Sequence, residues 1–168
     1  MISSSIRVAT LVLVGLAICR GAGAETPVTT SSSPPQDAAL RWTVQVKPEH
    51  PQPGDVVELV FTADIAPGWI LYSSDFSADI GPRPARFSFE PTAGLDLIEG
   101  VRAIKALRRR DKTWNTPYSY FEHHAEFRQK AKVTAPVKTI AGRIEGQTCF
   151  EESGLCELFR KAFTASLN

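Results

Sequence analysis

Residues 126–133 read Glu-Phe-Arg-Gln-Lys-Ala-Lys-Val, and the alternation of their side chains is typical of a β-strand. Every second side chain, from Phe127 to Val133, is uncharged, whereas Arg128, Lys130 and Lys132 between them are charged. Successive side chains of a β-strand point to opposite faces, so this pattern predicts a strand with one face in water.

Similar short runs occur on both sides of this segment. Pro and Gly separate them, as in the turn signal Pro67-Gly68, and no stretch sustains the 3.6-residue period of a helix. The runs cover residues 40–46, 56–63, 69–72, 87–89, 95–104, 140–148 and 155–163. Seven to nine short strands predict an all-β, immunoglobulin-like β-sandwich, with a small barrel as the alternative.

Composition narrows the class of protein further. The chain has 168 residues, of which 43% are hydrophobic, and its formal net charge is +1. This length predicts one domain with enough apolar mass for one core. A balance so near zero predicts no nucleic-acid partner and no binding to an anionic membrane surface.

The N-terminal residues resemble an export signal. Arg7 precedes an apolar run at 8–18, which is too short to span a bilayer, and Ala22-Gly23-Ala24 supplies small residues for cleavage. We therefore predict a signal peptide at 1–24, cleaved after Ala24, and a periplasmic protein. The alternatives are an uncleaved anchor and a lipoprotein anchored at Cys19.

Downstream of the signal, a Thr/Ser/Pro-rich stretch predicts a disordered linker at 25–39. The domain is expected at 40–168, and we expect it to be a monomer. After the predicted signal, the sequence contains no run of eighteen apolar residues, so it predicts no membrane helix.

Two cysteines, Cys149 and Cys156, remain after the predicted cleavage. In an oxidising compartment such a pair is normally a disulfide. Ser153-Gly154 between them is a turn signal, and a hairpin would bring the two Cα atoms to about 4.5 Å, which a disulfide tolerates. Spacing alone leaves open whether the bridge is structural or reactive. Glu151, Glu152 and Glu157 would each disfavour a thiolate if they lay close to it.

The order of several motifs resembles one protein family. They are Pro67-Gly68-Trp69-Ile70-Leu71-Tyr72, Gly81-Pro82 with Pro84 before Phe87 and Phe89, Asp111-Lys112-Thr113-Trp114, Phe127-Arg128-Gln129, and Gly146-Gln147-Thr148-Cys149 with Cys156. Together, over about residues 40–165, they are similar to the N-terminal periplasmic domain of DsbD and to disulfide-bond-corrector domains.

The resemblance implies an immunoglobulin-like fold with Cys149 and Cys156 as a redox-active pair. It also implies a relay of reducing equivalents from a membrane thiol–disulfide conductor to periplasmic thioredoxin-like proteins, in disulfide correction or cytochrome c biogenesis. By motif position, Trp114 would cap the cysteines from the loop that contains Asp111, and Tyr72 would line the site. No cofactor is implied, and which cysteine attacks stays open.

The alternatives belong to other classes. The chain ends at Asn168, so we expect a stand-alone domain with separate partners or one that has lost the redox role. A β-sandwich binding module with a purely structural disulfide is the second hypothesis, and whether the chain is a protein-disulfide reductase component stays open.

His123-His124, with His50 distant, does not match a metal-ligand spacing, so no metal is expected. Arg108-Arg109-Arg110 predicts a solvated loop, with a docking surface for an acidic partner as the alternative.

Overall fold

The computed structural model describes residues 39–77, 80–112 and 115–167, and these contain ten strands. The strands are β1 (Leu40–Lys47), β2 (Val56–Ile65), β3 (Trp69–Tyr72), β4 (Arg86–Phe89), β5 (Leu95–Ala103), β6 (Leu107–Arg110), β7 (Pro117–Glu122), β8 (His124–Val133), β9 (Thr139–Phe150) and β10 (Leu155–Ser166).

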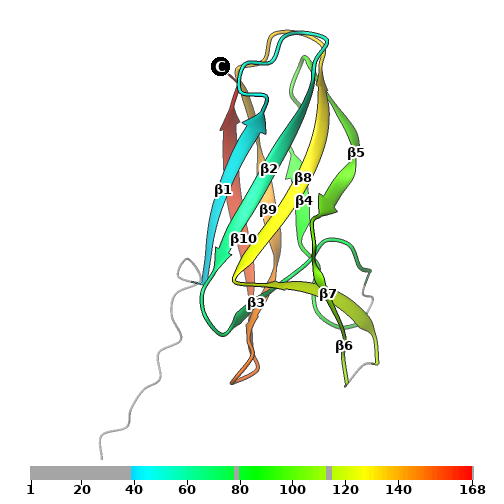
Figure 1. The fold of residues 1–168 in the computed structure, drawn as a ribbon, viewed down its shortest axis with the longest axis vertical. Coiled ribbons are helices and arrows are strands. Elements are labelled where there is room, and N and C mark those ends of the chain that lie inside the picture. Colours follow the sequence, from blue (N-terminus) through cyan, green and yellow to red (C-terminus); the bar gives the residue numbers. More distant parts are fainter. Residues whose placement is uncertain (1–38, 78–79, 113–114, 168) are drawn as a thin grey trace, which may run out of the picture. The chain divides into compact units, whose positions relative to one another are not determined.

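Two antiparallel sheets form the sandwich (Figure 1). One sheet has the order β1-β2-β8-β5, and the other has the order β10-β9-β3-β7-β6, with β4 also paired to β9. The prediction of an all-β, immunoglobulin-like sandwich is therefore confirmed, and the barrel alternative is wrong.

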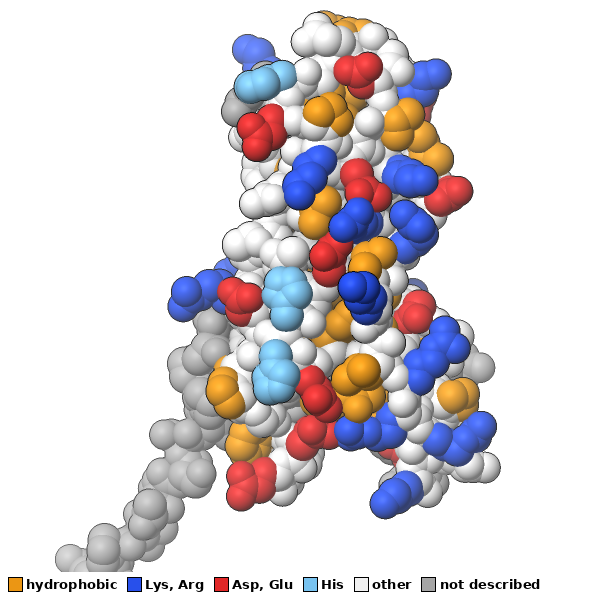
Figure 2. Space-filling model, viewed as in Figure 1, with side chains coloured by type: hydrophobic (Ala, Val, Ile, Leu, Met, Phe, Trp, Pro, Cys, Tyr) orange, Lys and Arg blue, Asp and Glu red, His pale blue; other side chains and the backbone are white. Residues whose placement is uncertain are grey.

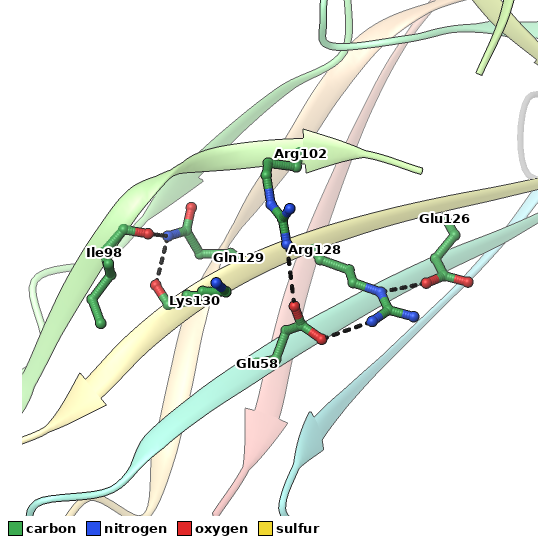
Figure 3. A network of polar contacts seen from close by, with 7 residues as sticks. All are labelled: Glu58, Ile98, Arg102, Glu126, Arg128, Gln129 and Lys130. Carbon is green, nitrogen blue, oxygen red and sulfur yellow. Dashed lines mark hydrogen bonds and ion pairs between the residues drawn. The ribbon is translucent and has the colours of Figure 1, made fainter. Parts of the chain in front are cut away.

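The alternation at residues 126–133 places the core as predicted. Phe127 and Ala131 on β8 are fully buried, and Phe127 lies opposite Phe61 of β2 in the sheet register. Gln129 shares this inward face and is 1% exposed. Its side-chain Nε2 donates hydrogen bonds to the carbonyl oxygens of Ile98 (3.0 Å) and Lys130 (2.7 Å), so burying its amide group leaves these donors paired (Figure 3).

The charged side chains of the same strand form an ion network on the outer face (Figure 3). Arg128 donates to Glu126 at 2.5 Å and to Glu58 of β2 at 2.9 Å, and Arg102 of β5 lies 3.7 Å from Glu58. The network spans three neighbouring strands of the first sheet.

The region expected to be a solvated loop around Arg108-Arg109-Arg110 is instead strand β6, and β7 follows it. β6 lies at the edge of its sheet, pairs only with β7 among the described strands, and exposes all four of its side chains. A strand with no buried face has no alternation to recognise, which is why the pattern did not predict it.

Strand β9 positions the cysteine hairpin. Its first part pairs with β4, from Gly142 opposite Phe89 to Glu145 opposite Arg86, and its last part pairs with β3. Gly142 allows the close approach of β4, because a Cβ atom there would lie 2.2 Å from the carbonyl oxygen of Ser88. β9 therefore extends from the core of the sandwich to Cys149 near its far end.

The predictions for the N-terminus concern residues outside those described: the signal peptide at 1–24, the lipidation site at Cys19, and the linker at 25–39 except Ala39. Among the described residues, no helix is long and apolar enough to cross a membrane.

Candidate functional site at the Cys149–Cys156 disulfide

The β9–β10 hairpin holds a disulfide between directly opposed residues. Cys149 and Cys156 face each other in the antiparallel register, with a Cα–Cα distance of 4.1 Å. Residues 151–154 make the turn, where Gly154 has a positive φ of 71° and its amide donates to the Phe150 carbonyl at 2.9 Å. The predicted hairpin and the disulfide are both present.

The two sulfur-bearing residues differ in their access to solvent. Cys149 is 4% exposed, whereas Cys156 is exposed. Among the described strands, β10 ends its sheet, whereas β9 is covered on one side by β10 and on the other by β3. An incoming thiolate must reach a disulfide sulfur along an open path, so Cys156 offers the accessible sulfur.

Cys149 packs in an aromatic cluster that is separate from the main core. Its members are Cys149, Ile70, Tyr72, Tyr118 and Tyr120, with Phe76 against them. The Tyr72 and Tyr118 rings are 5.3 Å apart, and the Tyr118 and Tyr120 rings are 5.8 Å apart. The cluster covers the outer face of β3 and β7 and shields one side of the disulfide.

Tyr72 lies in this cluster, and Asp111 acts on it electrostatically. Burial raises the pKa of Tyr72 to about 12, and the charges of Tyr118 and Asp111 add to that rise. The structure therefore brings together four of the predicted site residues, namely Cys149, Cys156, Tyr72 and Asp111. Trp114, the predicted cap, lies outside the described residues.

Arg109 of β6 joins the cysteine hairpin to the neighbouring strands. Its guanidinium donates to Glu151 in the hairpin turn at 2.5 Å and to the Tyr120 hydroxyl at 2.7 Å, and it lies 3.7 Å from Glu122. The guanidinium carbon also lies 4.5 Å from the centre of the Tyr120 ring. The β6–β7 hairpin and the cysteine hairpin are thus held together beside the aromatic cluster.

Gln147 contacts the buried sulfur directly. Its Oε1 accepts a hydrogen bond from the Arg83 backbone amide at 2.9 Å, so its NH₂ group must point the other way. That NH₂ lies 3.6 Å from Cys149 Sγ. If the disulfide is reduced, this donor is in place to stabilise negative charge on Cys149.

The three glutamates near the cysteines occupy different positions. Glu151 is paired with Arg109, which offsets its charge, and Glu152 is exposed in the turn. Glu157 is adjacent to Cys156 on β10, so strand alternation directs its side chain to the opposite face. Only two of the three therefore share the hairpin tip with the sulfurs.

Several site residues were not predicted from the sequence, namely Arg109, Tyr118, Tyr120 and Gln147. Arg109 belonged to a basic run that was expected to be solvated, and its partner Glu151 is 42 positions away. β7 buries four successive side chains, so it shows no alternation. Gln147 lies two positions before Cys149 on the same strand face, and this spacing could have identified it.

Fold and site together define an immunoglobulin-like domain with a half-shielded disulfide on an edge hairpin. A family model described as "Thiol:disulfide interchange protein DsbD, N-terminal" matches residues 29–167. The chain belongs to this family. Among curated protein sequences, no relative matches.

Solved structures show the same fold. The chain is similar to the reduced N-terminal domain of DsbD from Neisseria meningitidis, with a TM-score of 0.52 and 18% identity over 80% of this chain and 90% of that one. A structure of the complex between the DsbD N-terminal and PilB N-terminal domains from Neisseria meningitidis gives a TM-score of 0.51 and 15% identity, over 80% of this chain and 87% of that one. Identities this low support the fold alone.

Proposed function

We propose that this chain is an exported thiol–disulfide interchange domain that relays reducing equivalents between protein partners. The observation that carries the proposal is the asymmetry of the disulfide, with Cys156 exposed and Cys149 buried in the aromatic cluster. Membership of the family supports it. The compartment is proposed to be the periplasm, after cleavage of a signal peptide behind Ala24.

The chemistry is two successive exchanges. A donor thiolate attacks Sγ of Cys156, forms a mixed disulfide, and releases Cys149 as a thiolate beside the Gln147 amide. A second donor thiol then resolves the mixed disulfide, which leaves both cysteines reduced and the donor oxidised. To pass the electrons on, the Cys156 thiolate attacks an acceptor disulfide and forms a mixed disulfide with the acceptor. Cys149 then resolves this mixed disulfide, so two electrons reach the acceptor.

The disulfide contributes little to the core, which argues against a purely structural bridge. The main hydrophobic cluster is built around Phe61, Phe127 and Leu59, and Cys149 belongs to the separate aromatic cluster. A bridge that only stabilised the sandwich would be expected to join its two sheets, as in immunoglobulin domains. This one joins neighbouring strands of a single hairpin.

We propose two kinds of partner: a membrane thiol–disulfide conductor as donor and thioredoxin-like periplasmic proteins as acceptors, in disulfide correction or cytochrome c biogenesis. The similar solved complex, which pairs a DsbD N-terminal domain with a PilB N-terminal domain, supports the idea that this fold docks a second protein domain.

Single cysteine variants test the assignment. Mixed with a thioredoxin that has an activated disulfide, Cys149→Ser should accumulate a covalent adduct through Cys156. Cys156→Ser should accumulate much less, because Cys149 is buried. Equal trapping by both variants would overturn the assignment of Cys156 as the attacking residue.

A redox titration against glutathione separates exchange from a structural bridge. We expect a reduction potential within the range of exchange proteins, above about −300 mV. A potential far below that value would contradict the relay and favour the binding module with a structural disulfide.

A further inference from the structure

The outward face of β4, β9 and β10 carries an unbalanced set of positive charges beside the disulfide. Strand alternation places Arg86 on β4, Arg143 on β9 and Arg160 on β10 on the same face as Cys149 and Cys156. Arg83 precedes β4 and is also exposed. We call these four residues the basic strip.

One acidic residue lies among these outward strand positions. Glu145 of β9 stands between Arg86 and Arg160 in the register, and its carboxylate is 3.3 Å from Arg160. Among the described residues this is the only ion pair on the face, so Arg83, Arg86 and Arg143 form no ion pair there. Four arginines against one glutamate leave a local excess of positive charge, although the whole chain has a net charge of +1.

Two other basic regions of the domain are arranged differently. Arg108 and Arg109 of β6 pair with Asp75, Glu122 and Glu151. On the face over β2 and β8, positive and negative side chains are mixed, as Figure 2 shows. The basic strip differs from both, because three of its four arginines, Arg83, Arg86 and Arg143, form no ion pair with the part of the chain that the structure describes.

The strip is continuous with the reactive end of the hairpin. A groove of about 680 Å³ is lined by Arg83, Arg86, Arg160, Glu145, Leu158 and Phe159. Leu158, which is 49% exposed, lies two positions from Cys156 on the same strand face. On the side of the groove that Arg83 lines, the backbone amide of Arg83 donates a hydrogen bond to Gln147 Oε1, and Gln147 also contacts Cys149 Sγ. A molecule bound in the groove would therefore abut the disulfide.

We propose that the basic strip is the docking surface for an acidic segment of the protein partner, next to that partner's reactive cysteine. This inference rests on the proposed thiol–disulfide exchange and specifies the partner's surface. Positive charge lining the approach to a reactive group raises the encounter rate of a negatively charged partner and fixes its orientation. A protein is favoured over a lipid surface because the group at the end of the groove reacts with thiols and disulfides.

The test uses three short peptides, each a symmetric disulfide of one cysteine flanked by glutamates, glutamines or lysines. The Cys156 thiolate of the reduced chain attacks the peptide disulfide, forms a Cys156–peptide bond and releases one peptide thiolate. Cys149 then attacks Cys156, restores the original disulfide and releases the second thiolate. Two electrons pass from the chain to the peptide, and the thiolates equilibrate with water protons.

At low ionic strength the glutamate peptide should react about 10-fold faster than the lysine peptide. The ratio should fall toward about 2 in about 0.5 M salt, because salt screens exposed charges. The double variant Arg83→Glu with Arg86→Glu should abolish the preference. Arg41→Glu with Lys132→Glu is the matched control, since it changes the net charge equally on the outward face of the other sheet and should retain the preference.

Other outcomes overturn the proposal. Equal rates for the three peptides would leave exchange intact and remove the docking surface, whereas no exchange with any peptide would reject the proposed function as well. An equal loss of preference in both double variants would show a general charge effect. Binding of the wild-type chain to phosphatidylglycerol vesicles, lost in the Arg83 and Arg86 variant, together with equal peptide rates would assign the strip to a membrane surface instead.

Discussion

Reducing the Cys149–Cys156 disulfide should leave the sandwich folded and lower its free energy of unfolding by a modest amount. The two cysteines are 7 positions apart, so the bridge closes a loop of eight residues when both are counted. For a loop this short, the chain-entropy model gives about 2.5 kcal/mol at 25 °C. A domain of this size is typically stable by about 5–15 kcal/mol, so the reduced form should remain folded.

The structure indicates that reduction lowers the free energy of unfolding only by this loop-closure entropy. Cys149 packs with Tyr72, Tyr118 and Tyr120 rather than with the main core, and the backbone pairing of β9 with β10 should persist when the bridge is reduced. The ion pair between Arg109 and Glu151 should also continue to hold the turn in the reduced chain.

A thermodynamic cycle connects this stability to the redox chemistry. The stability that the bridge adds to the folded chain equals the extra free energy required to reduce it in the folded chain compared with the unfolded one. Since about 1.4 kcal/mol corresponds to about 30 mV for two electrons, about 2.5 kcal/mol lowers the potential by about 50 mV. A bridge stabilised so little stays reducible by a protein donor.

Urea unfolding of the oxidised chain, of the reduced chain, and of the variant with Cys149→Ala and Cys156→Ala measures the difference. The reduced chain and the double variant should agree within about 1 kcal/mol, since both lack the cross-link. A loss above about 5 kcal/mol, or loss of the strand signal in circular dichroism on reduction, would refute the reasoning and make the disulfide a structural element.

Four further predictions test the surroundings of the disulfide. Arg109→Gln should lower stability by only about 1 kcal/mol, because the pair with Glu151 is partly exposed, but should speed amide hydrogen exchange in the hairpin turn, and unchanged exchange would exclude the tether. Burial raises the pKa of Tyr72 to about 12 from 10.0, so between these pH values the folded state keeps a proton that the unfolded state has lost. The free energy of unfolding should therefore fall as the pH rises from 10.0 to about 12. Tyr72→Phe should weaken that fall in alkaline urea titrations. Gly142→Ala should cost about 3 kcal/mol in urea unfolding, since its Cβ would lie 2.2 Å from a backbone oxygen of β4, and a neutral result would contradict that packing. Trp114→Ala should let glutathione react faster with the disulfide while leaving circular dichroism unchanged, and an unchanged rate would remove the capping role.

The strands that pack one face against the core were predictable, and the residues around the sulfurs were less so. Residues 126–133 alternate because Phe127 and Ala131 face the core while Arg128 and Lys130 face water. Burial of one strand face requires apolar residues at every second position, and this period is visible in the sequence. The turn at Gly154 and the spacing of the cysteines likewise predicted a hairpin close to the observed geometry, with a Cα–Cα distance of 4.1 Å.

Two features resisted prediction for opposite reasons. β6 exposes all four side chains and β7 buries four in succession, so neither has the alternating pattern of a half-buried strand. The contact between Arg109 and Glu151 joins positions 42 residues apart, and only the pairing of whole strands brings them together. Tyr118 and Tyr120 reach Cys149 by the same route, because β3 lies between β7 and β9.

Strand β6 has a further consequence for how the domain behaves at high concentration. It ends its sheet among the described strands, so its outer row of backbone amides and carbonyls offers a template to a strand from another molecule. Arg108, Arg109 and Arg110 are all exposed along this edge. Charged side chains on an edge strand hinder its pairing with another edge, so these arginines would oppose edge-to-edge aggregation.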